Sequence, residues 1–229
     1  MVGLRAKPAT PVAVVATPVA TVTAPTPQAA DAAPTAPQLT RLGAGRATQV
    51  AFDRQQTKVA VATAIGVYLY DAQAFTRLGF QETRTPVQAV AFAPDGTELA
   101  FSTSGPHAQL YQWRLADKSL ATQTLDEPLT HGLAFSPDGA YLVGIAFDHL
   151  LIWRAADRKL RLAHEQPGAL HRAIAFTPDG RQLAVLSRDR LELWRLGENR
   201  LMQAMTPPAG RYFSTETVAF APTGAYLAN

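Results

Sequence analysis

Histidine, serine and aspartate are the residue types with which this sequence could bind a metal or perform acid–base or nucleophilic chemistry. No two histidines have the spacing of metal ligands, and we expect all five to lie at the surface, in loops and at strand ends: His107, His131, His149, His164 and His171. No serine stands in a Gly-x-Ser-x-Gly elbow or a comparable activating setting, and there is no Gly-rich phosphate loop. The sequence therefore predicts a protein that is not an enzyme and that needs no metal or other cofactor.

The best candidates for a carboxylate cluster are three aspartates that each follow a proline and precede a glycine. They are Asp95, Asp138 and Asp179, followed by Gly96, Gly139 and Gly180. In a Pro-Asp-Gly turn the proline presets φ, the aspartate accepts backbone hydrogen bonds, and the glycine takes the left-handed conformation that lets a hairpin return. Since the turn itself requires these aspartates, we expect them to be structural and to lie on separate units of the fold.

The turns belong to a repeat that occurs five times. Each copy begins with an apolar segment that ends in phenylalanine, at Phe52, Phe92, Phe135, Phe176 and Phe220. Successive phenylalanines are 40, 43, 41 and 44 residues apart, a spacing typical of solenoids, arrays and propellers. The last copy is partial because the sequence ends at Asn229.

Each repeat reads as four β-strands, and no segment has a helical period long enough for a helix. The predicted units span residues 47–80, 86–125, 129–165 and 170–205, with a partial unit at 216–229. Strands such as Leu150–Trp153 are apolar on both faces, which indicates sheets that are covered on both sides. Trp113, Trp153 and Trp194 share one position at the end of the third strand, so core packing is favoured over a stacking platform for nucleic acid or sugar. We predict an all-β protein of stacked, four-stranded antiparallel sheets.

In these residues the chain resembles the WD-repeat β-propeller family, in a divergent form of bacterial style. The resemblance covers residues 39–229 and rests on the Phe-x-Pro-Asp-Gly turns and the aromatic-ended third strands. The family's Trp-Asp pair is replaced by Trp-Arg in three repeats, and its Gly-His pair is absent from every repeat. Ser187, Asp189 and Trp194 could form part of the family's hydrogen-bonded network, which remains incomplete without that histidine.

The resemblance implies a ring, and the repeats fill only part of one. Propellers typically close with about four to eight blades, whereas four blades and part of a fifth make an open arc. Leu39–Leu42 could be the strand that completes a last blade in this family, but that blade would lie beyond Asn229. Two explanations stay open: the chain is a fragment of a longer protein, or another subunit supplies the missing blades. In either case an exposed apolar blade face predicts self-association of the isolated chain.

Residues 1–38 have a different composition, rich in Pro, Ala and Thr, and we expect a disordered linker. A faint secretory-signal pattern is interrupted by Pro11 and Pro18 and is too short to span a membrane. The compartment stays open: cytoplasmic if Met1 is the true start, extracytoplasmic or membrane-tethered if a signal or anchor precedes it. The chain has no cysteine and a net charge of +3, and its Lys and Arg are scattered without interleaved aromatics, so nucleic-acid binding is not expected.

The expected function is that of a non-catalytic scaffold for a protein or peptide partner. In the family, partners dock on the face with the loops that follow the second and fourth strands of each blade. The basic residues and histidines expected there are Arg84, His107, His149, Arg172, Arg188, Arg190 and Arg211, and their charge favours an acidic partner. Two alternatives are a sensory or docking module of a larger signalling protein, such as a bacterial protein kinase, and an extracytoplasmic ligand binder or enzyme with a site in the central channel.

Overall fold

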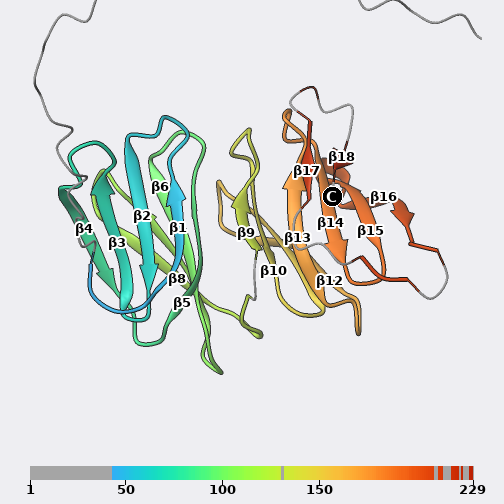
Figure 1. Ribbon diagram of the computed structural model, residues 1–229, viewed down its shortest axis with the longest axis horizontal. Helices are drawn as coiled ribbons and strands as arrows, with labels where there is room; N and C mark the ends of the chain where they lie inside the picture. Colours follow the sequence, from blue (N-terminus) through green and yellow to red (C-terminus); the bar gives the residue numbers. More distant parts are fainter. Residues whose placement is uncertain are drawn as a thin grey trace, which may run out of the picture. The chain divides into compact units, whose positions relative to one another are not determined.

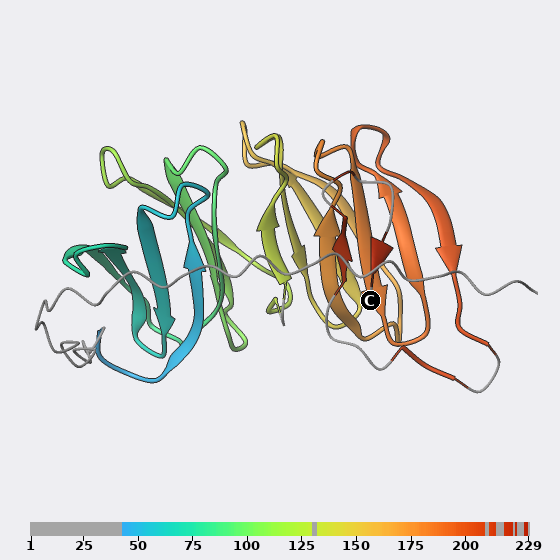
Figure 2. The ribbon, with the colours of Figure 1, turned by 45° about the horizontal axis from the view of Figure 1, so that its top comes forward.

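The computed structural model describes residues 43–129, 132–208, 211–213, 218–221, 223 and 227–228 (Figures 1 and 2). The expected linker at 1–38 and the expected strand at Leu39–Leu42 lie outside these residues. The described part is an all-β structure, in which the only helix is the short 3-10 helix η1 (Leu196–Glu198). No helix among the described residues is long and apolar enough to cross a membrane.

Four antiparallel sheets of four strands each form the first four blades, and in each sheet the strands pair in sequence order. Blade 1 comprises β1 (Ala47–Phe52), β2 (Lys58–Thr63), β3 (Gly66–Asp71) and β4 (Arg77–Glu82). Blade 2 comprises β5 (Val87–Phe92), β6 (Glu98–Thr103), β7 (Gln109–Arg114) and β8 (Leu120–Thr124). Blade 3 comprises β9 (Gly132–Phe135), β10 (Tyr141–Ile145), β11 (His149–Arg154) and β12 (Leu160–Glu165).

Blade 4 comprises β13 (His171–Phe176), β14 (Gln182–Ser187), β15 (Leu191–Arg195) and β16 (Arg200–Met205). A fifth sheet pairs β17 (Ala219–Phe220) with β18 (Leu227–Ala228). The first strand of each sheet lies next to the first strand of the following sheet, from β1 through β5, β9 and β13 to β17 (Figure 1). Stacked four-stranded sheets whose first strands are neighbours are the blades of a β-propeller.

The core lies between the blades, which explains why the central strands are apolar on both faces. In β2, Ala60 and Ala62 pack in one cluster with Leu99 and Phe101 of blade 2. The residue between them on β6, Ala100, belongs instead to a cluster with Leu142 of blade 3. Because successive side chains of a strand point to opposite faces, a blade between two neighbours needs apolar residues at every central position.

Three of the turns between first and second strands have the Pro-Asp-Gly geometry. Gly96, Gly139 and Gly180 have φ values of 69°, 73° and 72°, the left-handed region that favours glycine. The aspartate of each turn accepts local hydrogen bonds; Asp179 Oδ1, for example, accepts from Thr177 Oγ1 at 2.6 Å and from the Arg181 backbone N–H at 3.1 Å. These carboxylates therefore build the turns.

The turn in blade 1 has neither proline nor glycine, and a buried carboxylate holds it instead. Asp53 accepts hydrogen bonds from the Thr57 backbone N–H at 2.7 Å, the Thr57 hydroxyl at 2.6 Å and the Lys58 backbone N–H at 2.8 Å. Burial by itself raises the pKa of Asp53, but these hydrogen bonds outweigh it and hold the pKa below its usual value. One side chain thus replaces the turn chemistry of the other repeats.

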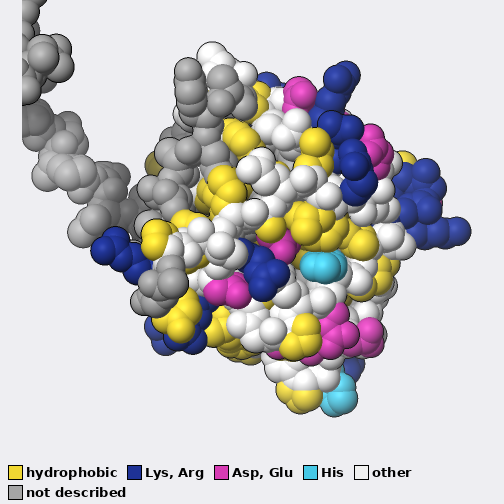
Figure 3. All heavy atoms as spheres, turned by 90° about the vertical axis from the view of Figure 1, so that its right-hand side faces the viewer, with side chains coloured by type: hydrophobic (Ala, Val, Ile, Leu, Met, Phe, Trp, Pro, Cys, Tyr) yellow, Lys and Arg dark blue, Asp and Glu magenta, His cyan; other side chains and the backbone are white. Residues whose placement is uncertain are grey.

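Apolar side chains are exposed on the first strand of blade 1 and the outer strand of blade 4. Val50 and Phe52 of β1 are 51% and 57% exposed, whereas Val90, at the position of Val50 in the next repeat, is buried against blade 1. On β16 the exposed apolar residues are Leu201, Met202 and Met205. Figure 3, which views the side of the molecule where β16 lies, shows hydrophobic side chains scattered over the surface, with most Lys and Arg side chains at the upper right and others at the left and near the centre.

Candidate functional site

The strand order fixes which predicted site residues can meet. Because neighbouring strands run in opposite directions, the loop after the second strand and the loop after the fourth strand lie at the same end of a blade. Arg84 follows β4 in blade 1, and His107 lies between β6 and β7 in blade 2. Since blades 1 and 2 pack side by side, these two side chains are held near each other.

A groove between blades 1 and 2 contains both residues, and we call it the blade 1–2 groove. Its volume is about 800 Å³. Five hydroxyl groups, an amide, two charged side chains and an imidazole line it: Glu82, Thr83, Arg84, Thr85, Thr103, His107, Gln109, Tyr111 and Thr122. Side chains of this kind are suited to hydrogen bonding with a polar ligand.

The wall of the groove is held in place by hydrogen bonds and ring stacking. Tyr111 donates its hydroxyl hydrogen to Gln109 Oε1 at 2.5 Å, and its ring stacks on Phe101 with centroids 4.8 Å apart and planes at 6°. Thr103 Oγ1 accepts from the Gln109 backbone N–H at 3.0 Å. Across the groove, the Thr83 hydroxyl donates to the Thr85 carbonyl at 2.8 Å. A ligand would therefore meet a wall whose rotamers are already fixed.

Arg84 and His107 are exposed donors beside this fixed wall. Both are exposed, and neither forms an ion pair or a side-chain hydrogen bond within the described part of the chain. The Arg84 guanidinium offers five N–H donors in a fork that matches a carboxylate. The groove can thus bind a carboxylate together with neighbouring polar groups, while the hydroxyl groups of Thr83, Thr103 and Tyr111 already make structural hydrogen bonds.

His149 lies in a different site, a pocket between blades 2 and 3 that we call the blade 2–3 pocket. Its Nδ1 is 3.0 Å from Glu127 Oε2, which stands in the loop after β8. The pocket has a volume of about 210 Å³ and an apolar floor that includes Leu151 and Trp153. The structure therefore does not place His149 with Arg84 and His107.

Arg190 is engaged in a network between blades 3 and 4, which we call the blade 3–4 network. Its guanidinium is 3.2 Å from Asp189 Oδ2 and 3.9 Å from Glu192 Oε1. With its amide oriented to satisfy both neighbours, Gln166 accepts from Arg190 Nε at 2.7 Å and donates to Glu192 Oε1 at 3.3 Å. The buried Glu192 carboxylate also accepts from the indole N–H of Trp194 at 3.0 Å. Arg190 thus neutralises buried acid and offers little charge to a partner.

The other three predicted arginines lie on the blade 4 side of the fold. Arg188 stacks over the ring of Tyr212, with its guanidinium carbon 4.2 Å from the ring centroid. Arg172 is half-buried on β13, and Arg211 is exposed. The seven predicted residues are consequently spread over several blades, and two of them, Arg84 and His107, line one cavity in the blade 1–2 groove.

His171 corrects the expectation that every histidine is at the surface. It is 3% exposed at the start of β13, and its Nδ1 lies 2.8 Å from Ser187 Oγ. Burial, assisted by the nearby His164, lowers the pKa of His171 from 6.5 to about 4. Ser187 therefore pairs with His171, and Trp194 with Glu192, instead of both joining Asp189. His131 lies outside the described residues.

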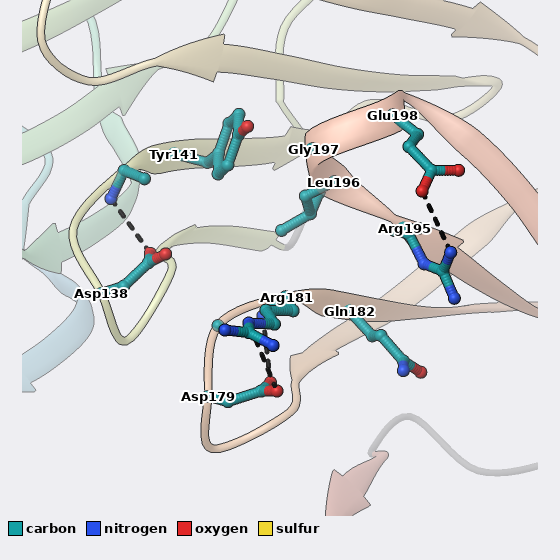
Figure 4. Close-up of a pocket in the computed structure, with 11 residues that line it drawn as sticks. Asp138, Tyr141, Asp179, Arg181, Gln182, Arg195, Leu196, Gly197 and Glu198 are labelled. Carbon is teal, nitrogen blue, oxygen red and sulfur yellow. Dashed lines mark hydrogen bonds and ion pairs between the residues drawn. The ribbon is translucent and has the colours of Figure 1, made fainter.

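The opposite end of blades 3 and 4 has a pocket of about 580 Å³ that is lined by charged residues (Figure 4). Its charges are satisfied locally: Arg195 donates to Glu198 at 3.0 Å, and Asp179 lies 4.0 Å from Arg181. The Thr177 hydroxyl and the Arg181 backbone N–H lower the pKa of Asp179, and the Arg195 guanidinium lowers the pKa of Glu198. Acids with lowered pKa values are ionised near neutral pH and are poor general acids.

Within the described ranges no three His, Asp or Glu side chains are placed to hold a metal ion.

Sequence reasoning named His149 and Arg190 but missed four other residues that give the inter-blade sites their character: Gln109, Tyr111, Leu151 and Glu192. The residues two positions before the three tryptophans are Tyr111, Leu151 and Glu192, and those four positions before are Gln109, His149 and Arg190. These equivalent positions line the blade 1–2 groove and the blade 2–3 pocket and form the blade 3–4 network. Alignment of the repeats on their tryptophans would have shown that the position two residues earlier holds a tyrosine, a leucine and a glutamate in the three repeats.

No protein-family model matches this sequence, and no curated protein matches it significantly. Solved structures do resemble the fold. Hydrazine synthase of Kuenenia stuttgartiensis superposes with a TM-score of 0.68 at 14% identity, over 79% of this chain and 54% of that one. The β-propeller domain of Cps50 (Swd1) from Myceliophteria thermophila superposes with a TM-score of 0.67 at 15% identity, over 81% of this chain and 62% of that one. The chain thus spans little more than half the length of these structures. At such identities the similarity shows the fold: residues 43–228 contain the blades of a β-propeller.

Proposed function

We propose that this chain is a divergent WD-repeat propeller that acts as a non-catalytic protein-interaction module, with the blade 1–2 groove as its docking site. The repeated Phe-x-Pro-Asp-Gly turns and the similarity to the Swd1 propeller domain support the family assignment. The observation that carries the function is the combination, in one groove, of a fixed hydroxyl-rich wall with two exposed donors, Arg84 and His107, that have no partner among the described residues.

The groove suits a polar peptide segment that carries a carboxylate. Arg84 would take the carboxylate in its fork, while threonine hydroxyls and the Gln109 amide meet backbone groups of the segment. Glu82 also lines the groove, so a run of acidic residues along its whole length is disfavoured by like-charge repulsion. The expected ligand has one acidic residue among neutral polar ones.

Peptide display against the whole chain tests this function. Peptides are selected from a random library, and the affinity of individual fluorescein-labelled peptides is measured by fluorescence anisotropy. Arg84→Glu should weaken the selected acidic peptides about tenfold or more, because reversal of the charge replaces an attraction by a repulsion. His107→Ala should weaken them less, since an imidazole offers fewer hydrogen-bond donors than the guanidinium fork of Arg84.

Arg54→Glu is the matched control. Arg54 is also exposed, but it lies in the turn between β1 and β2, at the other end of blade 1. The same change in net charge there should leave the affinities unchanged. If no peptide is selected, or if Arg54→Glu and Arg84→Glu weaken binding equally, the groove is not a docking site and the proposed function is wrong.

A further inference from the structure

The blade 2–3 pocket differs in character from the groove beside it. The two sites occupy equivalent positions, each bounded by the loop after the fourth strand of one blade and by the third and fourth strands of the next. In the blade 2–3 pocket, Leu151 stands where Tyr111 stands in the groove, and Ala163 stands where Thr122 stands. These two exchanges replace hydroxyl groups by apolar side chains.

The floor of the pocket is rigid and apolar. Trp153 is 2% exposed and Leu125 is 5% exposed. A Cβ atom at Gly144 would lie 3.1 Å from Trp153 Cζ3 and 2.7 Å from Leu129 Cδ1, which shows how closely the chain packs behind the indole. Leu160 contributes an apolar side chain that is 43% exposed. Because such a site is already ordered, an apolar ligand group binds it without the entropic cost of immobilising its side chains.

The size of the pocket limits what it can hold. At about 210 Å³ it is smaller than the roughly 300–1,000 Å³ of sites that enclose a whole small-molecule ligand. It suits one large apolar side chain that projects from a partner. Buried anchors of this kind supply much of the binding energy at protein interfaces.

The rim of the pocket is acidic. Asp126 and Glu127 are exposed there, and no Lys or Arg is among the lining residues. His149 is paired with Glu127, whereas Asp126 has no ion-pair partner among the residues that the structure describes. The rim therefore complements a cationic side chain next to the apolar anchor.

We infer that the blade 2–3 pocket binds a peptide of the partner that carries a large apolar residue beside a Lys or Arg. The apolar side chain packs on Leu151, Trp153 and Leu160, and the cation lies at Asp126 and Glu127. The inference rests on the proposed function as a protein-interaction module and adds a second subsite of opposite charge preference to it.

The test uses the random-peptide display described for the groove, with variants of the pocket. Leu151→Glu introduces the residue that blade 4 has at this position, Glu192, whose carboxylate fills the space beside Trp194. The whole chain should select peptides with an apolar–basic pair, and Leu151→Glu should weaken them about tenfold or more in fluorescence anisotropy. Peptides that depend on Arg84 should bind this variant as they bind the unchanged chain.

A second variant avoids any change in the core. Asp126→Asn combined with Glu127→Gln removes the rim charge and leaves the floor intact, so the peptides should lose their preference for Lys or Arg but keep the apolar anchor. Selection of Arg84-dependent peptides without apolar–basic ones would overturn this inference and leave the proposed function standing. Selection of no peptide at all would overturn both. Loss of self-association in Leu151→Glu, with peptide binding unchanged, would identify a second copy of the chain as the occupant and reject a peptide ligand.

Discussion

The indole N–H of Trp194 donates a hydrogen bond of 3.0 Å to Glu192 Oε2, although these residues are only 4% and 1% exposed. Trp153 occupies the same position in blade 3, but Leu151 takes the place of the glutamate, and the Trp153 indole nitrogen has no hydrogen-bond partner among the described residues. Blade 4 therefore has a buried carboxylate that joins its third strand to blade 3 through a polar network, whereas blade 3 has an apolar side chain at the equivalent position.

Removal of the Glu192 carboxylate should destabilise the fold. Glu192→Ala leaves the Trp194 N–H, the Gln166 amide and the Arg190 guanidinium without their shared acceptor, at an expected cost of about 3 kcal/mol in the free energy of unfolding. Urea unfolding measures this cost. Glu198→Ala is the control, because Glu198 pairs with Arg195 at the exposed surface, where ion pairs contribute little to stability. Equal effects of the two substitutions would contradict the structural role of the network.

Buried His171 should make the fold sensitive to mild acid. Its pKa is lowered from 6.5 to about 4 in the folded chain, so the unfolded chain binds a proton that the folded chain resists. The contribution of His171 to the free energy of unfolding should consequently fall as the pH drops below about 6.5. It should stop changing once the pH is below about 4. His171→Val, which introduces the residue found at the equivalent position Val87, should flatten the pH dependence in this window. Urea unfolding at several pH values gives the slopes, and an unchanged slope would show that another group is responsible.

Asp53 should be the most sensitive aspartate of the repeat turns. It is 2% exposed. Of the turns between the first and second strands of the first four blades, the one that Asp53 stabilises is the only one without proline or glycine. Asp53→Ala removes the charged acceptor of three hydrogen bonds from Thr57 and Lys58, and we expect a loss of about 2–3 kcal/mol in thermal or urea unfolding. Asp95→Ala, in an exposed turn that keeps its proline and Gly96, should cost about 1 kcal/mol or less. A larger loss at Asp95 than at Asp53 would refute this ranking.

Gly180 combines a left-handed backbone with a close approach to the neighbouring blade. Its φ is 72°, and a Cβ atom there would lie 2.9 Å from Asp138 Cγ in the turn of blade 3. Gly180→Ala should therefore cost about 1–2 kcal/mol or more in unfolding free energy. Gly197→Ala tests the same change where no atom lies within 4 Å of the added Cβ, and there we expect a change of less than about 0.5 kcal/mol. Similar losses for both variants would mean that neither the backbone conformation nor the contact matters.

Much of the fold followed from local patterns in the sequence. The alternation of apolar residues, the Pro-Asp-Gly turns and the spacing of Phe92, Phe135 and Phe176 predict four-stranded blades, and the structure has four such sheets, although β4 ends at Glu82, beyond the predicted unit 47–80. Such patterns are informative because the period of a strand and the conformation of a turn depend on residues that are close in the chain. The same local turn pattern accounts for the aspartates at positions 95, 138 and 179, so no catalytic role is needed to explain them.

The tertiary structure alone decided which side chains meet between blades. Arg84 and His107 come from consecutive repeats and share a groove, whereas Arg190, equally basic in the sequence, is neutralised by Glu192 and Asp189. His171 looked like a strand-end histidine and is buried, because the position of a side chain relative to the next blade is set by strand register and sheet packing. Repeats therefore predict the blades, but the chemistry of each inter-blade site depends on contacts between residues that are far apart in the chain.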